Sequence, residues 1–420
     1  MELTKAKYKQ TEVGLIPEDW NVVSIGSQCQ IFGRIGFRGY TVDDIVKEDQ
    51  GAITLSPSNI VNGQLNLKKL TFLSWFKYDE SPEIKIFDGD ILLVKTGSTY
   101  GKTALVKNLK QKATLNPQIV VLKKTRCDNM YLGYLMGYPI VKNQIESSVV
   151  GGAIPTLSQE QVSRFMIPLP PTLNEQKAIA TALSDVDDLI ANLDKLINKK
   201  KAIKQGAMQQ LLTPPHKGGK RLAGFSGEWV ECELQSLCDV IGGGTPSTTV
   251  YEFWNGEINW FTPTEIGANK YVSISKRKIT RLGLKSSSAQ ILPIGTILLT
   301  TRASIGDAAI LQKEGCTNQG FQSLVPKEKN DSEFLYQLIL TLTNDLLNLS
   351  SGSTFLEISP KKIKSLKVSV PESISERNSI ALILSDIDKE IEQFETKKTK
   401  YQDIKQGMMQ ELLTGKTRLV

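Results

Sequence analysis

The chain contains a long segment that occurs twice. Residues 172–213 read TLNEQKAIATALSDVDDLIANLDKLINKKKAIKQGAMQQLLT, and residues 373–414, 201 positions later, repeat the pattern without a gap as SISERNSIALILSDIDKEIEQFETKKTKYQDIKQGMMQELLT. Each copy opens with a capping box just after proline, which is typical of a helix start. About 40 residues at 1.5 Å each predict a helix of roughly 60 Å. The chain is therefore predicted to be two copies of one plan.

Apolar residues in each copy recur at alternating steps of four and three, which predicts one narrow apolar stripe per helix. We expect the two stripes to pair within the chain, because each carries the seam that the other needs. The alternative is that each stripe packs on its own neighbouring domain. The predicted partner-helix seam is Ile179, Leu183, Val186, Ile190 and Leu193, then Ile197, in the first copy, and Ile380, Leu384, Ile387, Ile391 and Phe394 in the second.

Beyond Ile197 the seam weakens, and the copies share a different surface, Ile-Lys-Gln-Gly followed by Met-Gln and Leu-Leu-Thr. Gly206 and Gly407 occupy the same place in the two copies. A glycine in a helix interior costs about 1 kcal/mol relative to alanine. Its recurrence predicts a close backbone approach or a bend at this place.

Composition excludes several classes of protein. With 420 residues the chain suits two domains and connecting elements. No apolar run is long enough for a membrane helix, and the first ten residues are not followed by the apolar segment of a signal peptide. We therefore expect a cytoplasmic protein. The five cysteines form no CxxC pair and are expected to be reduced and mostly buried. The single histidine, His216, lies in a connector, which argues against a His-based metal site or a Ser-His-Asp triad.

The segments outside the repeat also correspond to each other. Similar runs follow Trp20 and Trp229, and strand-like runs at 91–94 and 297–299 occupy equivalent places, so the globular parts are expected to share an α/β or α+β fold. The C-terminal copy stops where the N-terminal segment would resume, which predicts that the chain ends lie together and close a pseudo-symmetric ring. The predicted parts are an N-terminal segment (1–20), a first globular domain (21–171), a central helix (172–213), a linker (214–229), a second globular domain (230–371) and a C-terminal helix (372–420).

Three motifs imitate catalytic sites. GSTYGKT at 97–103 has three residues where a phosphate-binding P-loop needs four. The run 116–118, Asn-Pro-Gln, lacks the second proline and the aromatic ring with which adenine methyltransferases hold a flipped base. Asp79 with Glu83-Ile84-Lys85 imitates a nuclease set that the second copy lacks. The chain is therefore predicted to have no methyltransferase, nuclease or ATPase site of its own.

The repeated LSD(V/I)D and IKQG(A/M)MQ(Q/E)LLT motifs, together with GGGTPST, YEFWNGEINWFTP and CTNQGFQSL in the second domain, resemble the specificity subunits of type I restriction-modification systems. The resemblance covers essentially the whole chain. It implies two target recognition domains, each reading half of a bipartite DNA sequence, held apart by an antiparallel coiled coil with pseudo-two-fold symmetry. It also implies two modification subunits, which are adenine-N6 methyltransferases, and restriction subunits as partners. S-adenosylmethionine, ATP and magnesium are expected on those partners and no cofactor on this chain.

The net charge of +7 and the pI near 8.9 are compatible with DNA binding. Arginine, asparagine and glutamine can pair with base edges through two hydrogen bonds. The alternatives from other classes are a small two-domain phosphate- or nucleotide-binding enzyme that uses the Lys102 region, and a coiled-coil protein adaptor. The candidate DNA-binding residues are Arg34, Arg38, Lys95 and Tyr100 in the first domain, and Thr245, Ser247, Tyr251, Arg302, Asn318 and Gln319 in the second.

Overall fold

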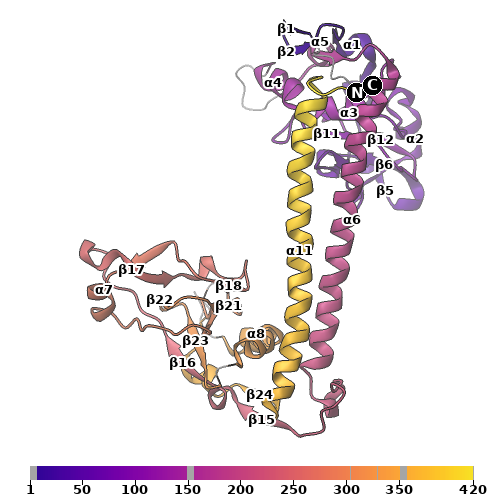
Figure 1. Cartoon of the computed structure of the whole chain (residues 1–420). Helices are drawn as coiled ribbons and strands as arrows, with labels where there is room; N and C mark the ends of the chain where they lie inside the picture. The colour runs from indigo at the N-terminus through magenta and orange to yellow at the C-terminus, as the bar shows by residue number, and fades with distance from the viewer. Residues whose placement is uncertain (1–6, 149–155, 303, 329, 351–356, 420) are drawn as a thin grey trace. The chain divides into compact units, whose positions relative to one another are not determined.

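The structure is a computed structural model that describes residues 7–148, 156–302, 304–328, 330–350 and 357–419. The chain divides into two compact units, Met1–Asn192 with Lys398–Val420, and Leu193–Lys397. The two predicted long helices are α6 (Leu173–Leu211) and α11 (Ile374–Leu412), each of 39 residues (Figure 1). Each unit therefore combines one globular domain with a stretch of both helices.

The first unit has a central sheet of order β11-β10-β13-β4 and an outer sheet of order β12-β6-β9-β5. Its strands are β1 (Tyr8–Thr11), β2 (Gly14–Pro17), β3 (Asn21–Ser24), β4 (Gln30–Gly33), β5 (Ile45–Val46), β6 (Gly51–Leu55), β7 (Ile60–Val61), β8 (Gln64–Leu65), β9 (Phe72–Ser74), β10 (Ile91–Val94), β11 (Thr103–Leu105), β12 (Ala113–Leu115), β13 (Ile119–Lys123) and β14 (Met166–Leu169). Its shorter helices are α1 (Ile25–Gln28), α2 (Trp75–Asp79), α3 (Asn129–Met136), α4 (Pro139–Ser148) and α5 (Gln159–Arg164).

The second unit has a central sheet of order β16-β23-β20-β21-β18 and an outer sheet of order β19-β17-β22. Its strands are β15 (Trp229–Glu233), β16 (Cys238–Gly242), β17 (Trp254–Phe261), β18 (Tyr271–Val272), β19 (Arg277–Ile279), β20 (Ile297–Leu299), β21 (Ala308–Leu311), β22 (Gly315–Thr317), β23 (Gln322–Pro326) and β24 (Lys367–Pro371). Its shorter helices are α7 (Arg281–Lys285), α8 (Ser332–Thr341), α9 (Thr343–Leu349) and α10 (Pro360–Lys364).

The central sheet of each unit is buried on both faces. Alternate residues of a strand point to opposite sides of the sheet, and both sets of residues lie in a hydrophobic core. On β10, Ile91 and Leu93 belong to the core that includes α3 and α6, whereas Leu92 and Val94 belong to the core shared with the outer sheet. On β20, Leu298 faces the outer sheet and its two neighbours face α8 and α11. The apolar runs in the sequence thus reflect two-sided burial.

The two globular domains share one fold. Strands β4, β13, β10 and β11 have the same order as β16, β23, β20 and β21. In each outer sheet one strand pair is parallel, β6 with β12 and β17 with β22. Each of the strands β6 and β17 leads into a capping box, with Asn59 and Glu265 respectively at the third helical position. The predicted α+β class and the predicted equivalence of the domains are confirmed.

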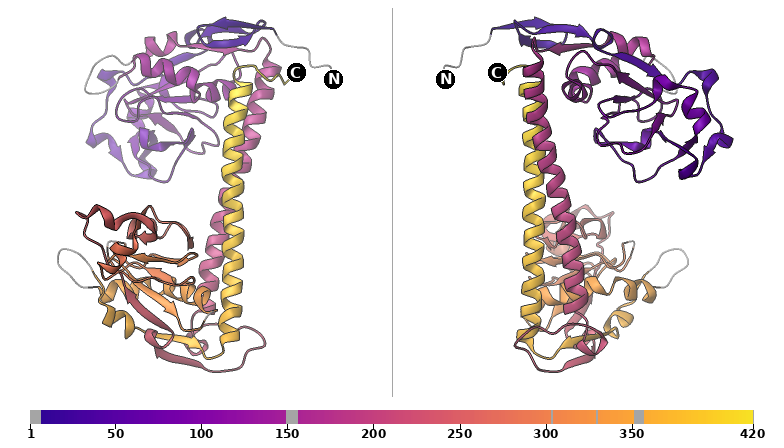
Figure 2. Two further views of the ribbon diagram at one scale, coloured as in Figure 1. Left: turned by 60° about the vertical axis from the view of Figure 1, so that its left-hand side comes forward. Right: turned by 90° about the vertical axis from the view of Figure 1, so that its right-hand side faces the viewer.

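In each unit a stretch of α6 lies beside a stretch of α11 (Figure 2). The helices are antiparallel, because the residue numbers of the ion-paired positions rise along α6 while those of their partners fall along α11. Lysines on α6 are linked to acidic residues on α11 through Lys200–Glu390 and Lys204–Asp388 in the second unit. The predicted intramolecular helix pair is therefore confirmed.

The seam residues divide between two kinds of contact. Ile179 and Leu183 are fully buried in the first unit's core together with Leu412 and Leu413 at the end of α11. Ile380 and Leu384 are buried in the second unit's core with Leu212. Further along, Val186, Leu193, Ile197 and Ile391 are also buried, and Ile190, Ile387 and Phe394 are half-buried. The start of each stripe thus packs on its own domain as well as on the other helix.

Candidate nucleic-acid interface

The repeated motifs LSDxD and IKQG meet across the helix pair. In the first unit the Asp187 carboxylate lies 2.7 Å from Lys405 Nζ. In the second unit Asp388 lies 2.6 Å from Lys204 Nζ. Asp187 and Asp388 are equivalent residues of the two copies, and so are the two lysines. Each ion pair therefore joins one copy of the repeat to the other.

Each globular domain adds a further donor to this joint. The Tyr134 hydroxyl of α3 donates to Asp187 over 2.8 Å, and Gln337 of α8 donates to Asp388 over the same distance. Burial, followed by the negative charge of Asp187, raises the pKa of Tyr134. The tyrosine hydroxyl therefore stays protonated and acts as a donor. In each unit one carboxylate, Asp187 or Asp388, therefore joins both long helices to the globular domain.

An arginine in the segment that follows a long helix provides a second joint in each unit. Arg418 donates two 2.9 Å bonds to Asp19 and also bonds to the buried carboxylate of Glu175, whose amide donates to the Thr172 hydroxyl at the start of α6. Arg221 contacts the equivalent Glu376 over 2.6 Å. The hydrogen bond from Arg418 lowers the pKa of Asp19. Residues near the two chain ends are thus joined, while Met1 and Val420 themselves lie outside the described residues.

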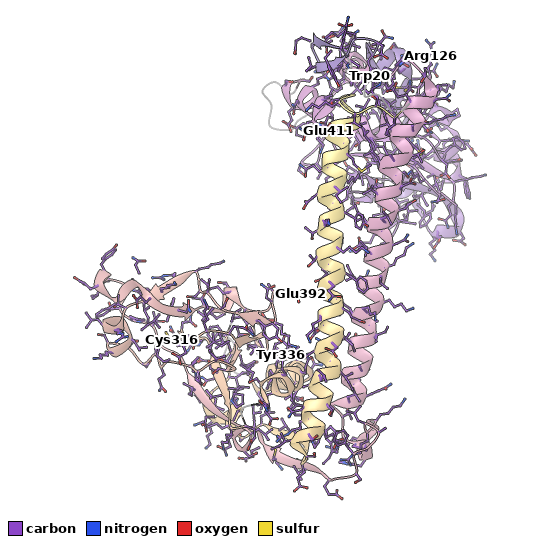
Figure 3. The ribbon with its side chains drawn as sticks, viewed as in Figure 1. Trp20, Arg126, Cys316, Tyr336, Glu392 and Glu411 are labelled. Carbon is purple, nitrogen blue, oxygen red and sulfur yellow. The ribbon has the colours of Figure 1, made fainter. Side chains whose placement is uncertain are left out.

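The aromatic ring beside this arginine is buried. Trp20, labelled in Figure 3, has no exposed surface, and the Arg418 guanidinium lies 5.9 Å from its ring centroid. Tyr8 donates to the Lys416 carbonyl over 3.1 Å. The segment from 8 to 20 and the segment from 412 to 419 therefore pack together within the first unit.

Part of the shared helix ending is exposed, although its leucines and methionines pack on the cores. Ile203 is 45% exposed and its equivalent Ile404 is 40% exposed. A Cβ built on Gly206 or Gly407 would meet nothing within 4 Å. The prediction of a close backbone approach at these glycines is wrong for contacts within the chain, and each glycine lies inside a continuous helix. Each unit thus presents an open patch, called here the repeated face: Ile203, Gln205, Gly206 and Gln209 in one copy, and Ile404, Gln406, Gly407 and Gln410 in the other.

The candidate residues of the first domain lie in different environments. Arg34 is only 5% exposed, and its guanidinium donates to the Leu115 and Arg38 carbonyls and to the Thr114 hydroxyl. These bonds favour a structural role for Arg34. Arg38 is half-buried and lies 3.3 Å from Glu83. Lys95 and Tyr100 are half-buried as well.

The candidate residues of the second domain lie mainly on two neighbouring loops. Thr245 donates to the Gln319 side chain, which brings the glycine-rich loop to the turn after β22. Tyr251 is 78% exposed, and Ser247 bonds to the Thr249 hydroxyl. Asn318 instead accepts a bond from the Gly320 amide. Arg302 forms an ion pair of 2.7 Å with Glu357, away from these two loops in the chain.

The corner where a strand of each outer sheet runs into a short helix was not predicted from the sequence. Strand β9 leads into α2 through Ser74, and β19 leads into α7 through Thr280, and each of these residues caps its helix. Phe76 on α2 is 73% exposed, and Leu282 on α7 is 54% exposed. This corner has the same place in both domains and different exposed residues. The available signal was the run KRK followed by TRLGLK at 276–285, which carries five cations.

Two of the three motifs that imitate catalytic sites make ordinary structural contacts. Asn116 accepts a bond from the Gln118 amide over 2.6 Å, as Asn318 does in the second domain, so the 116–118 run is a turn that both domains share. Lys85 of the imitated nuclease set pairs with Asp79. In the part of the chain that the structure describes, no cluster of His, Cys, Asp and Glu suits a metal ion.

A cavity of about 870 Å³ in the first unit contains Lys102, the residue that the enzyme alternative would use. Its wall includes Lys107 and Lys142 but also the acidic residues Glu146 and Asp188. The cavity therefore lacks the one-signed charge expected of a phosphate site.

The cysteines and the helices bear on two further expectations from composition. All five cysteines are free, and all except the half-buried Cys232 are buried, as predicted. Burial raises the pKa of Cys316, labelled in Figure 3, to about 12. Among the described residues no helix is both long and apolar enough to span a membrane.

Comparison with known proteins agrees with this geometry. Residues 17–204 and 226–404 match the family model described as the type I restriction modification DNA specificity domain. The chain belongs to this family. The matched ranges include both globular domains and most of both long helices, so the family accounts for both copies of the plan. The resemblance inferred from the repeated motifs is confirmed.

Individual relatives support the same assignment. The chain is 27% identical over 426 residues to the putative type I restriction enzyme MjaX specificity subunit of Methanocaldococcus jannaschii, covering 98% of this chain and 97% of the relative. It is 41% identical over 169 residues to the MjaIX specificity subunit of the same organism, covering 39% of each. A crystal structure of the S subunit of the type I restriction-modification system from M. genitalium has the same fold, with a TM-score of 0.59, 17% identity, and coverage of 94% of this chain and 96% of that one.

Proposed function

We propose that this family member is a non-catalytic DNA-recognition subunit that reads a bipartite DNA sequence. Residues 21–171 read one half-site and residues 230–371 read the other. One observation carries the proposal: the two domains share the order of four central strands, yet the corners that follow β9 and β19 expose different side chains. Equal folds with unequal surfaces suit two related ligands, such as two different short base sequences. Neither alternative, enzyme or adaptor, has comparable support.

The charges of the second domain support binding to DNA. Within Lys276–Lys285, five cationic side chains lie in or beside β19 and α7. Among the described residues no carboxylate forms an ion pair with any of them. Unpaired lysines and arginines on one edge attract a phosphate backbone and contribute affinity that falls with salt.

The partners follow from the repeated face. A helix surface that combines an exposed isoleucine with an open glycine suits docking of another protein, because glycine lets a neighbouring backbone approach closely. The face occurs twice with identical residues at Ile203 and Ile404, which suits two identical subunits. We assign these subunits as the modification subunits, which supply S-adenosylmethionine chemistry. Restriction subunits would supply ATP- and magnesium-dependent cleavage.

Exchange of one recognition domain tests the proposed reading. Segment 230–371 is replaced by the same segment of a relative, and methylated adenines are mapped in cells that carry the modification subunit. One half-site should change while the other stays as it was. A change in both half-sites would refute the assignment of one half-site to each domain.

The docking surface has a matched control. The expected effect of Ile203→Asp or Ile404→Asp is to lower the number of bound modification subunits from two to one, measured by the mass of the purified complex. Leu189→Asp changes an equally exposed residue that is not repeated in the other copy. Its complex should keep two modification subunits, and equal losses in all three variants would refute the repeated face as the docking surface.

A further inference from the structure

A single arginine of the second domain lies over the face of an aromatic ring. The Arg277 guanidinium carbon lies 3.8 Å from the ring centroid of Trp254 and 5.4 Å from that of Trp260. The two tryptophans meet edge to face at 5.1 Å. Arg277 begins β19 and pairs in register with Trp260 of β17. Stacking of this kind fixes the plane of a guanidinium at little entropic cost.

The ring beneath the arginine is itself fixed. Trp254 Nε1 donates to the Ser247 carbonyl over 3.0 Å, and Trp260 Nε1 donates to the Gly244 carbonyl over 2.8 Å. Both tryptophans are buried. Gly244 is required at its position, because a Cβ there would come within 2.4 Å of the Ala289 amide nitrogen. The glycine-rich stretch at 242–244 and the tryptophans of YEFWNGEINWF thus form one support for Arg277.

The guanidinium supported in this way has unused hydrogen-bond donors. In the described residues neither a carboxylate nor a carbonyl accepts from the Arg277 side chain, which is exposed. Its neighbours Lys276, Lys278 and Arg281 are also without ion pairs in that part of the chain. The arrangement is pre-organised for an external acceptor with two adjacent oxygen or nitrogen atoms.

The first domain provides an internal comparison. Strand β6 pairs with β9 as β17 pairs with β19, and the two capping boxes that follow β6 and β17 fix the alignment. At the positions of Trp260 and Arg277 the first domain has Thr54 and Thr71, whose backbones are joined by a 2.9 Å bond. The fold is the same and the arginine with its aromatic support is absent there. This is the pattern expected of a residue that distinguishes what the two domains recognise.

We propose that Arg277, stacked on Trp254, reads a guanine edge in the half-site of the second domain. The inference rests on the proposed function, because it requires that this domain contacts DNA. Guanine presents O6 and N7 side by side in the major groove, and the arginine fork matches them with two hydrogen bonds. Lys276, Lys278, Arg281 and Lys285 then bind the phosphates on either side and contribute affinity without sequence preference.

Selection from a DNA library tests the proposal. The chain, assembled with its modification subunits, selects from duplexes in which the half-site read by the second domain is randomised. The wild-type complex should require guanine at one position. Arg277→Ala and Arg277→Lys should reduce the preference for that guanine by roughly tenfold or more, while preferences at the other positions and in the first half-site stay unchanged. The lysine variant keeps the charge and guards against a folding defect in the alanine variant.

Lys285→Ala is the matched control, because it removes a cation from the same edge without touching the stack. It should weaken binding to all sequences alike and reduce the salt dependence. If the Arg277 variants behave like this control, with uniform loss and an unchanged preference for guanine, the assignment of Arg277 as a base reader is refuted. A change confined to the first half-site would refute it as well. If the wild-type complex selects no sequence at all, the proposed function fails and the inference fails with it.

Discussion

The ion pair between Lys204 and Asp388 offers a quantitative test of the joint between the two repeats. Lys204→Met removes the charge and keeps the length of the side chain. The two side chains are 17% and 21% exposed and lie 2.6 Å apart, so water screens the pair only in part. Hydrogen bonds to charged groups contribute roughly 1.5–3 kcal/mol. For this partly exposed pair we expect a loss of about 1.5–2 kcal/mol, or about 3–8 °C in the Tm of the second unit.

Thermal and denaturant unfolding of the full-length chain, followed by circular dichroism, measures this loss. Lys199→Met is the control, because Lys199 is exposed on the same helix stretch and should change Tm little. Asp388→Asn completes a double-mutant cycle, which is needed because Asp388 also binds Gln337 and Lys270. A coupling free energy below about 0.3 kcal/mol, the limit of additivity for independent sites, would show that the shared motifs do not stabilise the helix pair.

Three further outcomes follow from the joints and from burial. A circular permutant opened between Thr213 and Lys220, with the original ends joined by a generous flexible linker, should fold and bind its partners, and failure to do so would show that the chain ends lie far apart. Insertion of seven residues after Leu193 and after Phe394 keeps the heptad phase and lengthens each helix by roughly 10 Å. The unread DNA between the two half-sites, mapped by methylation, should grow by about three base pairs at 3.4 Å each, while the half-site bases stay unchanged. Binding should weaken, because the added base pairs also rotate one half-site about the DNA axis. At pH 8 an alkylating reagent should modify Cys232 before the other thiols. Burial raises the pKa of Cys127 to about 11 and those of Cys29, Cys238 and Cys316 to about 12, so these four thiols stay neutral and unreactive. Mass spectrometry of the native chain measures the order, and earlier modification of a buried thiol would contradict this prediction.

The repeat and its helices could be predicted because their signals are local. Capping boxes, heptads and strand-like runs each occupy a few neighbouring residues, and α6 begins at Leu173, one residue after the predicted start. The equivalence of the runs at β10 and β20 was visible for the same reason. The boundaries assigned to the six parts of the chain stay a prediction.

The functional residues were harder to predict, because their surroundings come from distant parts of the chain. Arg34 lies in a glycine-rich loop typical of a binding surface, yet its nearest acceptor is the Leu115 carbonyl, 81 residues away. Arg277 lies in an ordinary basic run, and its position over Trp254 depends on the register of β19 against β17 and on the irregular pairing between Trp254 and Ile258. Composition alone cannot distinguish a satisfied arginine from an available one.

The ion pairs between LSDxD and IKQG also bear on a shortened chain with a single globular domain. A chain that ended after residue 213 would keep one copy of each motif, both on α6. In such a chain Asp187 and the retained lysine would belong to the same helix, which is too straight to pair them. Two copies of the shortened chain could satisfy both joints reciprocally. The shortened chain should then form a symmetric dimer, and if each domain reads one half-site, as proposed above, its DNA target should be a palindrome.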